Sequence, residues 1–125
     1  MVRIKRVYDS HSDDDGKRVL VDRVWPRGIP RDRLHLHEWM KDVAPSTELR
    51  KWFAHRSERW SEFVRRYEAE LNAPDKAESL NRLAQWAKTG TVTLLFSARD
   101  EKHNQAVVLA DVLTRKFTLE RPGRR

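Results

Sequence analysis

The stretch TVTLLFSARDEKHNQAVVLADVLTRKF, residues 91–117, decides the fold. Residues 91–96 form a β-branched and apolar run, which predicts a buried strand. After a polar segment, apolar residues recur at the spacing of one helix face: Ala106, Leu109, Ala110, Leu113 and Phe117. A strand that leads directly into a helix is the repeating unit of α/β proteins. We therefore expect a mostly parallel sheet with helices on its faces.

Two more strands are expected near the amino end of the chain. Residues 18–25, RVLVDRVW, contain an apolar run without alternation, as expected of a strand that is covered on both faces. Residues 3–8, RIKRVY, form the other strand. The connection between them, residues 9–16, ends in a turn glycine. It is too short for an ordinary parallel crossover, so the direction of the first strand stays open.

Three helices are expected between residues 46 and 90. Ser46 is placed to cap the first helix and Ser57 the second. Asp75 and Glu78 have the spacing of a capping box at the start of the third helix, which Gly90 ends. The apolar faces of the first two helices consist of Leu49, Trp52 and Phe53, then of Trp60, Phe63, Val64, Tyr67 and Leu71.

The length of 125 residues suits one domain with one core. We expect a single α/β domain over residues 1–118, with a small, mostly parallel sheet flanked by helices. Residues 119–125 are expected to form a frayed basic tail. No apolar run is long enough for a signal peptide or a membrane span, which predicts a cytoplasmic protein without a membrane partner. The oligomeric state is left open.

Cysteine is absent from the sequence, and this excludes disulfides and thiolate chemistry. A metal site would have to use the five scattered histidines and the carboxylates. His35 and His37 could share one strand face, but a third ligand is missing. We therefore predict no metal and no other cofactor.

The chain is basic, with 26 Lys and Arg against 19 Asp and Glu and a formal net charge of +7. Two interpretations stay open, a solvated basic surface and a surface that attracts nucleic acid. Trp52 and Trp60 fit helix core positions better than platforms for stacked bases.

Residues 97–100, SARD, follow the strand that decides the fold and precede its helix. Ligands of open α/β sheets bind beyond the carboxyl ends of the strands. Free N–H groups and the helix dipole favour an anion there, and Ser97, Arg99 and Asp100 would complete the pocket. The alternative is that Asp100 only caps the helix while Arg99 points into solvent. His103 is placed to act as a base for the Ser97 hydroxyl.

Residues 22–28, DRVWPRG, leave the second strand at the same edge of the sheet. Alternation along the strand places Arg23 on the face that carries the valines before it. An arginine on a buried strand needs a partner, so the alternative to a ligand contact is a structural ion pair with Asp9 or Asp22.

Two further features with an arginine could meet the same opening. Gly28 permits a tight turn that would aim Arg27 into the cleft. Ser46 and Arg50 lie at the start of a helix and could face the cleft as well. The alternative is that Ser46 serves only as a helix cap.

The segments RVYD (6–9), LVDRVWPRG (20–28), PSTELRKWF (45–53) and LLFSARDEKHNQAVVLAD (94–111) occur in this order. Together they cover most of the chain and resemble the YeaO-like branch of domain-of-unknown-function family 488. The resemblance implies a small bacterial cytoplasmic α/β protein without an established activity. It adds Arg6, Tyr8 and Asn104 to the candidate ligand-binding residues.

Wider members of that family carry a cysteine near the position of Ser97 and a Cys-His pair near His103 and Asn104. This chain has serine, histidine and asparagine there. The resemblance therefore implies neither thiolate chemistry nor a metal, and it leaves two strand-end loops that face each other.

These features predict an arginine-rich cleft that binds an anionic small molecule with a phosphate or carboxylate group. If the protein is an enzyme, a hydrolase or group transferase fits the cleft, with Ser97, Asp22, Tyr8 or His103 in the chemistry. The alternative function is nucleic-acid binding through the basic surface. The expected anion contacts are Arg23, Arg27, Arg50 and Arg99.

Overall fold

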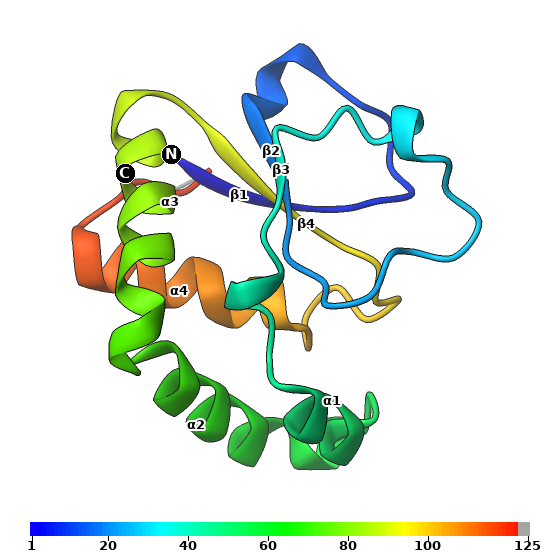
Figure 1. Ribbon diagram of the computed structural model, residues 1–125, viewed down its shortest axis with the longest axis vertical. Coiled ribbons are helices and arrows are strands. Elements are labelled where there is room, and N and C mark those ends of the chain that lie inside the picture. The colour runs from blue at the N-terminus through cyan, green and yellow to red at the C-terminus, as the bar shows by residue number, and fades with distance from the viewer. Residues whose placement is uncertain (123–125) are drawn as a thin grey trace.

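Four parallel strands form one sheet in the order β1-β4-β2-β3 (Figure 1). The computed structural model describes residues 1–122. Its strands are β1 (Val2–Arg6), β2 (Lys17–Leu20), β3 (Glu38–Trp39) and β4 (Val92–Phe96). The predicted α/β class and parallel sheet are confirmed. The first strand, whose direction the sequence left open, is parallel to the others. Its short connection suffices because it crosses a single strand, β4, with one 3-10 turn and no α-helix.

Both amino-terminal strands end earlier than the sequence predicts. β1 ends at Arg6, and β2 ends at Leu20 rather than at residue 25. Pairing stops there because the neighbouring strand β4 ends at Phe96, and Leu20 is paired with Leu95. Arg23 therefore lies in the loop after β2, so its predicted place on a strand face is wrong.

Four α-helices follow the predicted apolar stripes: α1 (Thr47–Phe53), α2 (Trp60–Leu71), α3 (Ala77–Thr89) and α4 (Gln105–Phe117). Ser46 caps α1 as predicted, because its side chain accepts the N–H of Leu49. The caps predicted at Ser57 and Asp75 are wrong, since α2 and α3 each continue from a 3-10 turn without a side-chain cap. Gly90 ends α3 as predicted.

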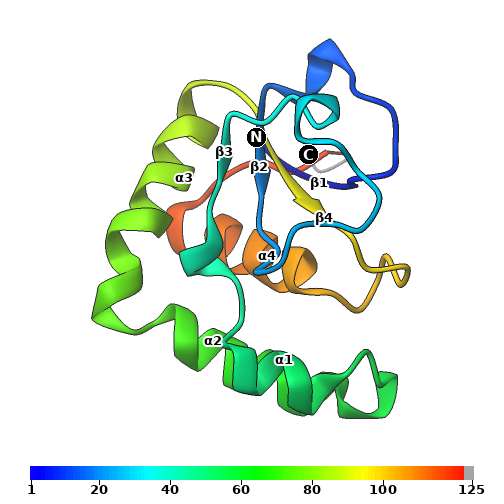
Figure 2. The ribbon, with the colours of Figure 1, turned by 45° about the vertical axis from the view of Figure 1, so that its right-hand side comes forward.

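The helices pack against one face of the sheet (Figure 2). Leu94 and Phe96 belong to the core cluster that holds the buried side chains of all four helices. Leu95 points to the opposite face, where it packs with Leu20 and Leu34. Long connections rather than helices cover that second face, which corrects the expectation of helices on both sides.

A buried charge cluster lies under these connections. Asp15 is fully buried and accepts hydrogen bonds from Lys5 Nζ at 3.1 Å and from the guanidinium of Arg18. Its carboxylate also accepts the N–H of Ser12 at 3.0 Å. Burial alone would raise the pKa of Asp15, but these three partners outweigh it and hold the pKa below the ordinary value of 3.8. The cluster therefore ties the connection after β1 to the sheet.

The residues after α4 return to the start of the sheet. Leu119 packs against the core, and the carbonyl of Glu120 accepts the N–H of Val2 at 2.9 Å. The first residues of the predicted tail are thus attached to the domain, whereas residues 123–125 lie outside the described part of the chain. Within residues 1–122 no helix is both long and apolar enough to span a membrane.

A candidate binding pocket at the carboxyl ends of the strands

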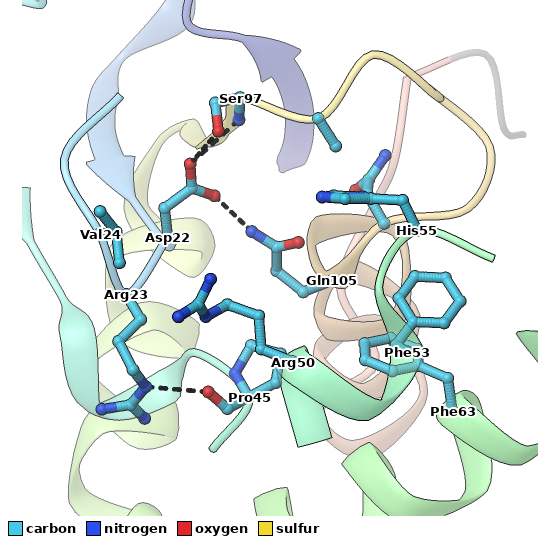
Figure 3. A pocket seen from close by; sticks show the side chains of 12 residues that line it. Asp22, Arg23, Val24, Pro45, Arg50, Phe53, His55, Phe63, Ser97 and Gln105 are labelled. Atoms are coloured by element: carbon cyan, nitrogen blue, oxygen red, sulfur yellow. Dashed lines mark hydrogen bonds between the residues drawn. The ribbon is translucent and has the colours of Figure 1, made fainter. Parts of the chain in front are cut away.

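A cavity of about 130 Å³ opens where the loops after β2 and β4 meet α1 and the start of α4 (Figure 3). This is the carboxyl edge of the sheet, where open α/β folds bind their ligands. Its lining divides into a polar floor and an apolar wall. The lining residues are Asp22, Arg23, Val24, Pro45, Arg50, Phe53, His55, Phe63, Ser97, Ala98, Asn104 and Gln105.

Asp22 forms the floor of the pocket. Its side chain is buried, and its Oδ2 atom accepts the Ser97 N–H at 3.1 Å and the Ser97 hydroxyl at 2.6 Å (Figure 3). The Oδ1 atom accepts the side-chain amide of Gln105. The indole of Trp39 donates to the Asp22 carbonyl at 2.7 Å and so fixes the backbone. Four groups from three separate elements therefore hold this carboxyl in place.

Asp22 interacts electrostatically with the nearby His55 but forms no ion pair with it. Within residues 1–122, no Lys, Arg or His forms an ion pair with Asp22. Burial raises the pKa of Asp22 above 3.8, and the hydrogen bonds from Ser97 and Gln105 only partly oppose that effect. A buried carboxyl with a raised pKa in a cavity is a common sign of a functional site.

Arg23 supports the wall of the pocket. Its Nε donates to the Pro45 carbonyl at 2.9 Å, and its Nη2 donates to the Ala44 carbonyl at 3.3 Å. The ion pair with Asp9 or Asp22 that the sequence suggested as an alternative is wrong. Arg23 lies in the loop after β2, where it meets the chain just before α1. The carbonyls of Ala44 and Pro45 therefore take the place of a carboxylate.

Arg50 projects from α1 into the opening. Its guanidinium points into the pocket on the side of Asp22 and Gln105 (Figure 3). No described residue accepts a hydrogen bond from it, unlike Arg23. The short helix that carries Arg50 is held by Ser46, whose N–H and hydroxyl both donate to Glu70, at 2.8 and 2.6 Å. Arg50 is thus a free cation on a fixed element.

The rim beside Arg50 has a strained backbone. Ala54 and His55 follow α1 with φ values of 48° and 57°, in the left-handed region that residues other than glycine rarely occupy. This turn brings His55 to the pocket, next to the apolar wall. The wall contains Phe53 and Phe63, whose rings stack with centroids 4.3 Å apart.

The predicted helix-end anion site does not form at residues 97–100. The helix begins later, at Gln105, and Asn104 caps it by accepting the N–H of Val107 at 3.1 Å. Asp100 instead shapes the loop, because it accepts the N–H of His103 and bonds its Nδ1 at 2.8 Å. The Ser97 N–H that was expected to meet an anionic ligand meets Asp22.

The structure brings together five predicted site residues: Asp22, Arg23, Arg50, Ser97 and Asn104. The other eight lie outside the pocket lining: Arg6, Tyr8, Arg27, Gly28, Ser46, Arg99, Asp100 and His103.

Arg6 lies behind the Ser97 loop, donating to the carbonyls of Ala98 at 3.0 Å and Ser97 at 3.4 Å. Its guanidinium also stacks on the ring of Tyr8, whose hydroxyl donates to the Arg27 carbonyl. These residues support the loops from outside.

Gln105 and His55 line the pocket but were not predicted. An asparagine directly before an apolar stripe is a capping signal, so Asn104 could have placed the helix start and with it Gln105. No sequence signal marks the left-handed turn that brings His55 to the rim.

His35 and His37 contact different aromatic side chains. His35 stacks on His11, and His37 meets the edge of Trp86. In the described part of the chain, no three His, Asp or Glu side chains gather in a way that could hold a metal ion.

Asp22→Asn is expected to leave the protein at least as stable as the wild type at about pH 7. The amide oxygen can accept from Ser97, and the Gln105 amide can turn over to pair with the new NH2 group. The folded-state pKa of Asp22 lies above its unfolded value, so ionisation costs stability as the pH rises through the folded-state pKa. The melting temperature of the variant relative to wild type should therefore rise from about pH 4 to pH 7. A variant that melts earlier at neutral pH would contradict this interpretation.

The fold and the pocket define a small α/β protein with a parallel sheet and a cavity with a polar floor at the carboxyl ends of its strands. The family described as the inactive DUF488-N3 subclade matches residues 1–124, and the chain belongs to this family. The resemblance inferred from the sequence is thereby confirmed.

Two relatives show how closely the chain follows this family. The uncharacterised protein YeaO of Escherichia coli K12 is 48% identical over 112 residues, which cover 90% of this chain and 96% of YeaO. The uncharacterised protein Rv3073c of Mycobacterium tuberculosis H37Rv is 46% identical over 112 residues, covering 90% of this chain and 92% of the relative. No solved structure matches the chain.

Proposed function

We propose that the pocket binds a small molecule with a carboxylate or phosphate group, with Arg50 as the main anion contact, and that the protein does not turn this ligand over. The observation that carries the proposal is the Arg50 guanidinium, which points into the cavity without a protein partner (Figure 3). The planar guanidinium fork matches both carboxylate and phosphate groups.

The size of the cavity limits the ligand. Cavities that hold drug-sized ligands measure roughly 300–1,000 Å³, whereas about 150 Å³ is enough for a molecule such as benzene. The cavity of about 130 Å³ thus suits an acid group with a few attached carbon atoms. A ligand of about six non-hydrogen atoms gains at most roughly 9 kcal/mol, so we expect dissociation constants of about 1 μM to 1 mM.

The polar floor favours binding over catalysis. The Ser97 hydroxyl donates to Asp22, and a carboxylate is a weak base for activating a hydroxyl. The imidazole that the sequence offered as a base, His103, bonds Asp100 through Nδ1 and lies outside the pocket lining. The family description as an inactive subclade supports the same proposal.

The basic surface is a weaker candidate site. Several of its arginines form ion pairs with nearby carboxylates, which reduces the positive field that would attract nucleic acid. These arginines are Arg56, Arg65, Arg66, Arg82 and Arg115.

Arg50→Ala is expected to weaken the binding of small acids by at least about tenfold, because a charge-assisted hydrogen bond contributes about 1.5–3 kcal/mol. The probes are propionate and ethyl phosphate, with their amino counterparts alanine and 2-aminoethyl phosphate. Binding is measured by calorimetry or by NMR titration. Arg99→Ala is the matched control, because Arg99 is exposed and lies outside the pocket lining.

The proposal fails if no probe binds the wild type, or if Arg50→Ala binds all probes as the wild type does. A single-stranded oligonucleotide that binds wild type and Arg50→Ala equally, with strong salt dependence, would favour the basic surface instead.

A further inference from the structure

The buried carboxyl of Asp22 restricts the chemistry of the ligand, in addition to the limit that the cavity volume sets on its size. All of its hydrogen-bond donors are neutral groups: the Ser97 N–H, the Ser97 hydroxyl and the Gln105 amide. Asp22 is 8% exposed as a residue, and it lines the cavity. Hydrogen bonds therefore hold this carboxyl in place, but none of its donors is a cation.

We propose that the ligand is a small zwitterion, with an amino group that binds at Asp22 and an acid group that binds at Arg50. This inference rests on the proposed function of the pocket. It adds an amino group to the ligand, which an anion site at Arg50 alone does not specify.

The floor offers acceptors that match an ammonium group. A carboxylate has about four acceptor positions, and three on Asp22 are in use, so one remains for the ligand. The Gln105 amide donates to Asp22 through nitrogen, which leaves its oxygen on the cavity side (Figure 3). The Ser97 oxygen, whose hydrogen points to Asp22, can accept as well. An ammonium has three N–H donors, and these three acceptors can receive them.

The group suited to an acid is Arg50, which lies on the Asp22 and Gln105 side of the cavity (Figure 3). Arg50 projects into the opening from α1, whereas His55 lies on the other side of Gln105, toward the apolar wall (Figure 3). The other charged group in the lining, Arg23, already donates to two backbone carbonyls. A ligand with an acid group alone would leave Asp22 buried without a counter-charge and would add a second negative charge close to it.

The apolar wall completes the fit. Phe53, Phe63 and Ala98 supply the apolar part of the lining beside these polar groups. Little volume remains after an amino group and an acid group are placed in about 130 Å³. A side chain of one or a few carbon atoms fits this description, and alanine is therefore a suitable probe.

The test compares molecules that differ at one group. Alanine, lactate and propionate share the acid and the carbon skeleton but carry an ammonium, a hydroxyl or a hydrogen; 2-aminoethyl phosphate and ethyl phosphate repeat the comparison for phosphate. We expect wild type to bind the amino compound of at least one series tenfold or more tightly than its partners, and to bind ethylamine weakly. The series that shows the preference identifies the acid group.

Asp22→Asn should reduce this preference to threefold or less, and lactate and propionate should bind this variant more tightly than wild type because the second negative charge is gone. Gln105→Leu, which removes one acceptor and leaves the carboxylate, should reduce the preference in part. The inference is overturned if wild type shows no preference for amino compounds, or if the preference survives in a folded Asp22→Asn variant. If acids bind without preference, the zwitterion inference alone falls; if no acid binds, the proposed function falls with it.

Discussion

Asp15→Asn should destabilise the protein by about 3–5 kcal/mol, the cost of leaving buried charges without their partner. Asp15 is fully buried, and Arg18, with 3% of its side chain exposed, depends on it. The asparagine keeps the shape and the hydrogen bond from Ser12 but not the charge that neutralises Lys5 and Arg18. Chemical denaturation monitored by tryptophan fluorescence measures the loss. Asp13→Asn, an exposed residue of the same turn, is the control and should change the stability by less than about 0.5 kcal/mol.

The same cluster predicts how the protein responds to acid. The folded-state pKa of Asp15 lies below its ordinary value of 3.8, so its stabilising effect is present above that value and is lost as the pH falls through the folded-state pKa. The wild type should therefore lose part of its advantage over Asp15→Asn in acid. An equal stability difference from about pH 7 to pH 3 would show that the carboxylate charge does not matter.

Gly16→Ala should cost about 3 kcal/mol or more, from the sum of backbone strain and a steric clash. Gly16 has a φ of +61°, and a Cβ atom there would lie 2.2 Å from the Thr91 carbonyl oxygen. That oxygen accepts the N–H of Lys17 at 2.9 Å, at the point where β2 begins to pair with β4. A methyl group would push the two central strands apart.

Gly28→Ala separates the two contributions to this cost. Gly28 also has a positive φ, of 81°, but a Cβ atom there would meet nothing within 4 Å. It should lose only the backbone contribution, about 1–2 kcal/mol. Equal losses for Gly16→Ala and Gly28→Ala would mean that contact with Thr91 is not what requires glycine.

The elements that could be predicted from the sequence are those with a regular pattern of apolar residues. The strand at 91–96 and the apolar stripes of all four helices follow from spacing alone. The end of β2 and the direction of β1 do not follow from spacing. Both depend on β4, which lies between β1 and β2 in the sheet but far from them in the sequence. The helices collect on one face, and the opposite face holds the Asp15 cluster, which no periodic pattern reveals.

The position of the pocket was predictable, but the direction of its side chains was not. The ends of two parallel strands had to meet at one edge, so residues after β2 and β4 were expected together. Arg27 and Arg99 nevertheless lie outside the lining while Arg50 lies within it, because loop conformation decides where each side chain points. The expected anion site at Ser97 turned out to be occupied by the protein's own carboxylate, Asp22.

The most direct test of the pocket as a ligand site is an NMR titration of the labelled protein with alanine, read at each amide. We expect the Ser97 backbone amide and the Gln105 side-chain amide, both bonded to Asp22, to shift as the ligand binds. In Arg50→Ala the same shifts should require at least about tenfold more alanine. Unchanged signals at these two groups, or shifts confined to the far groove beside Tyr8, His11 and His35, would contradict the assignment of this cavity as the binding site.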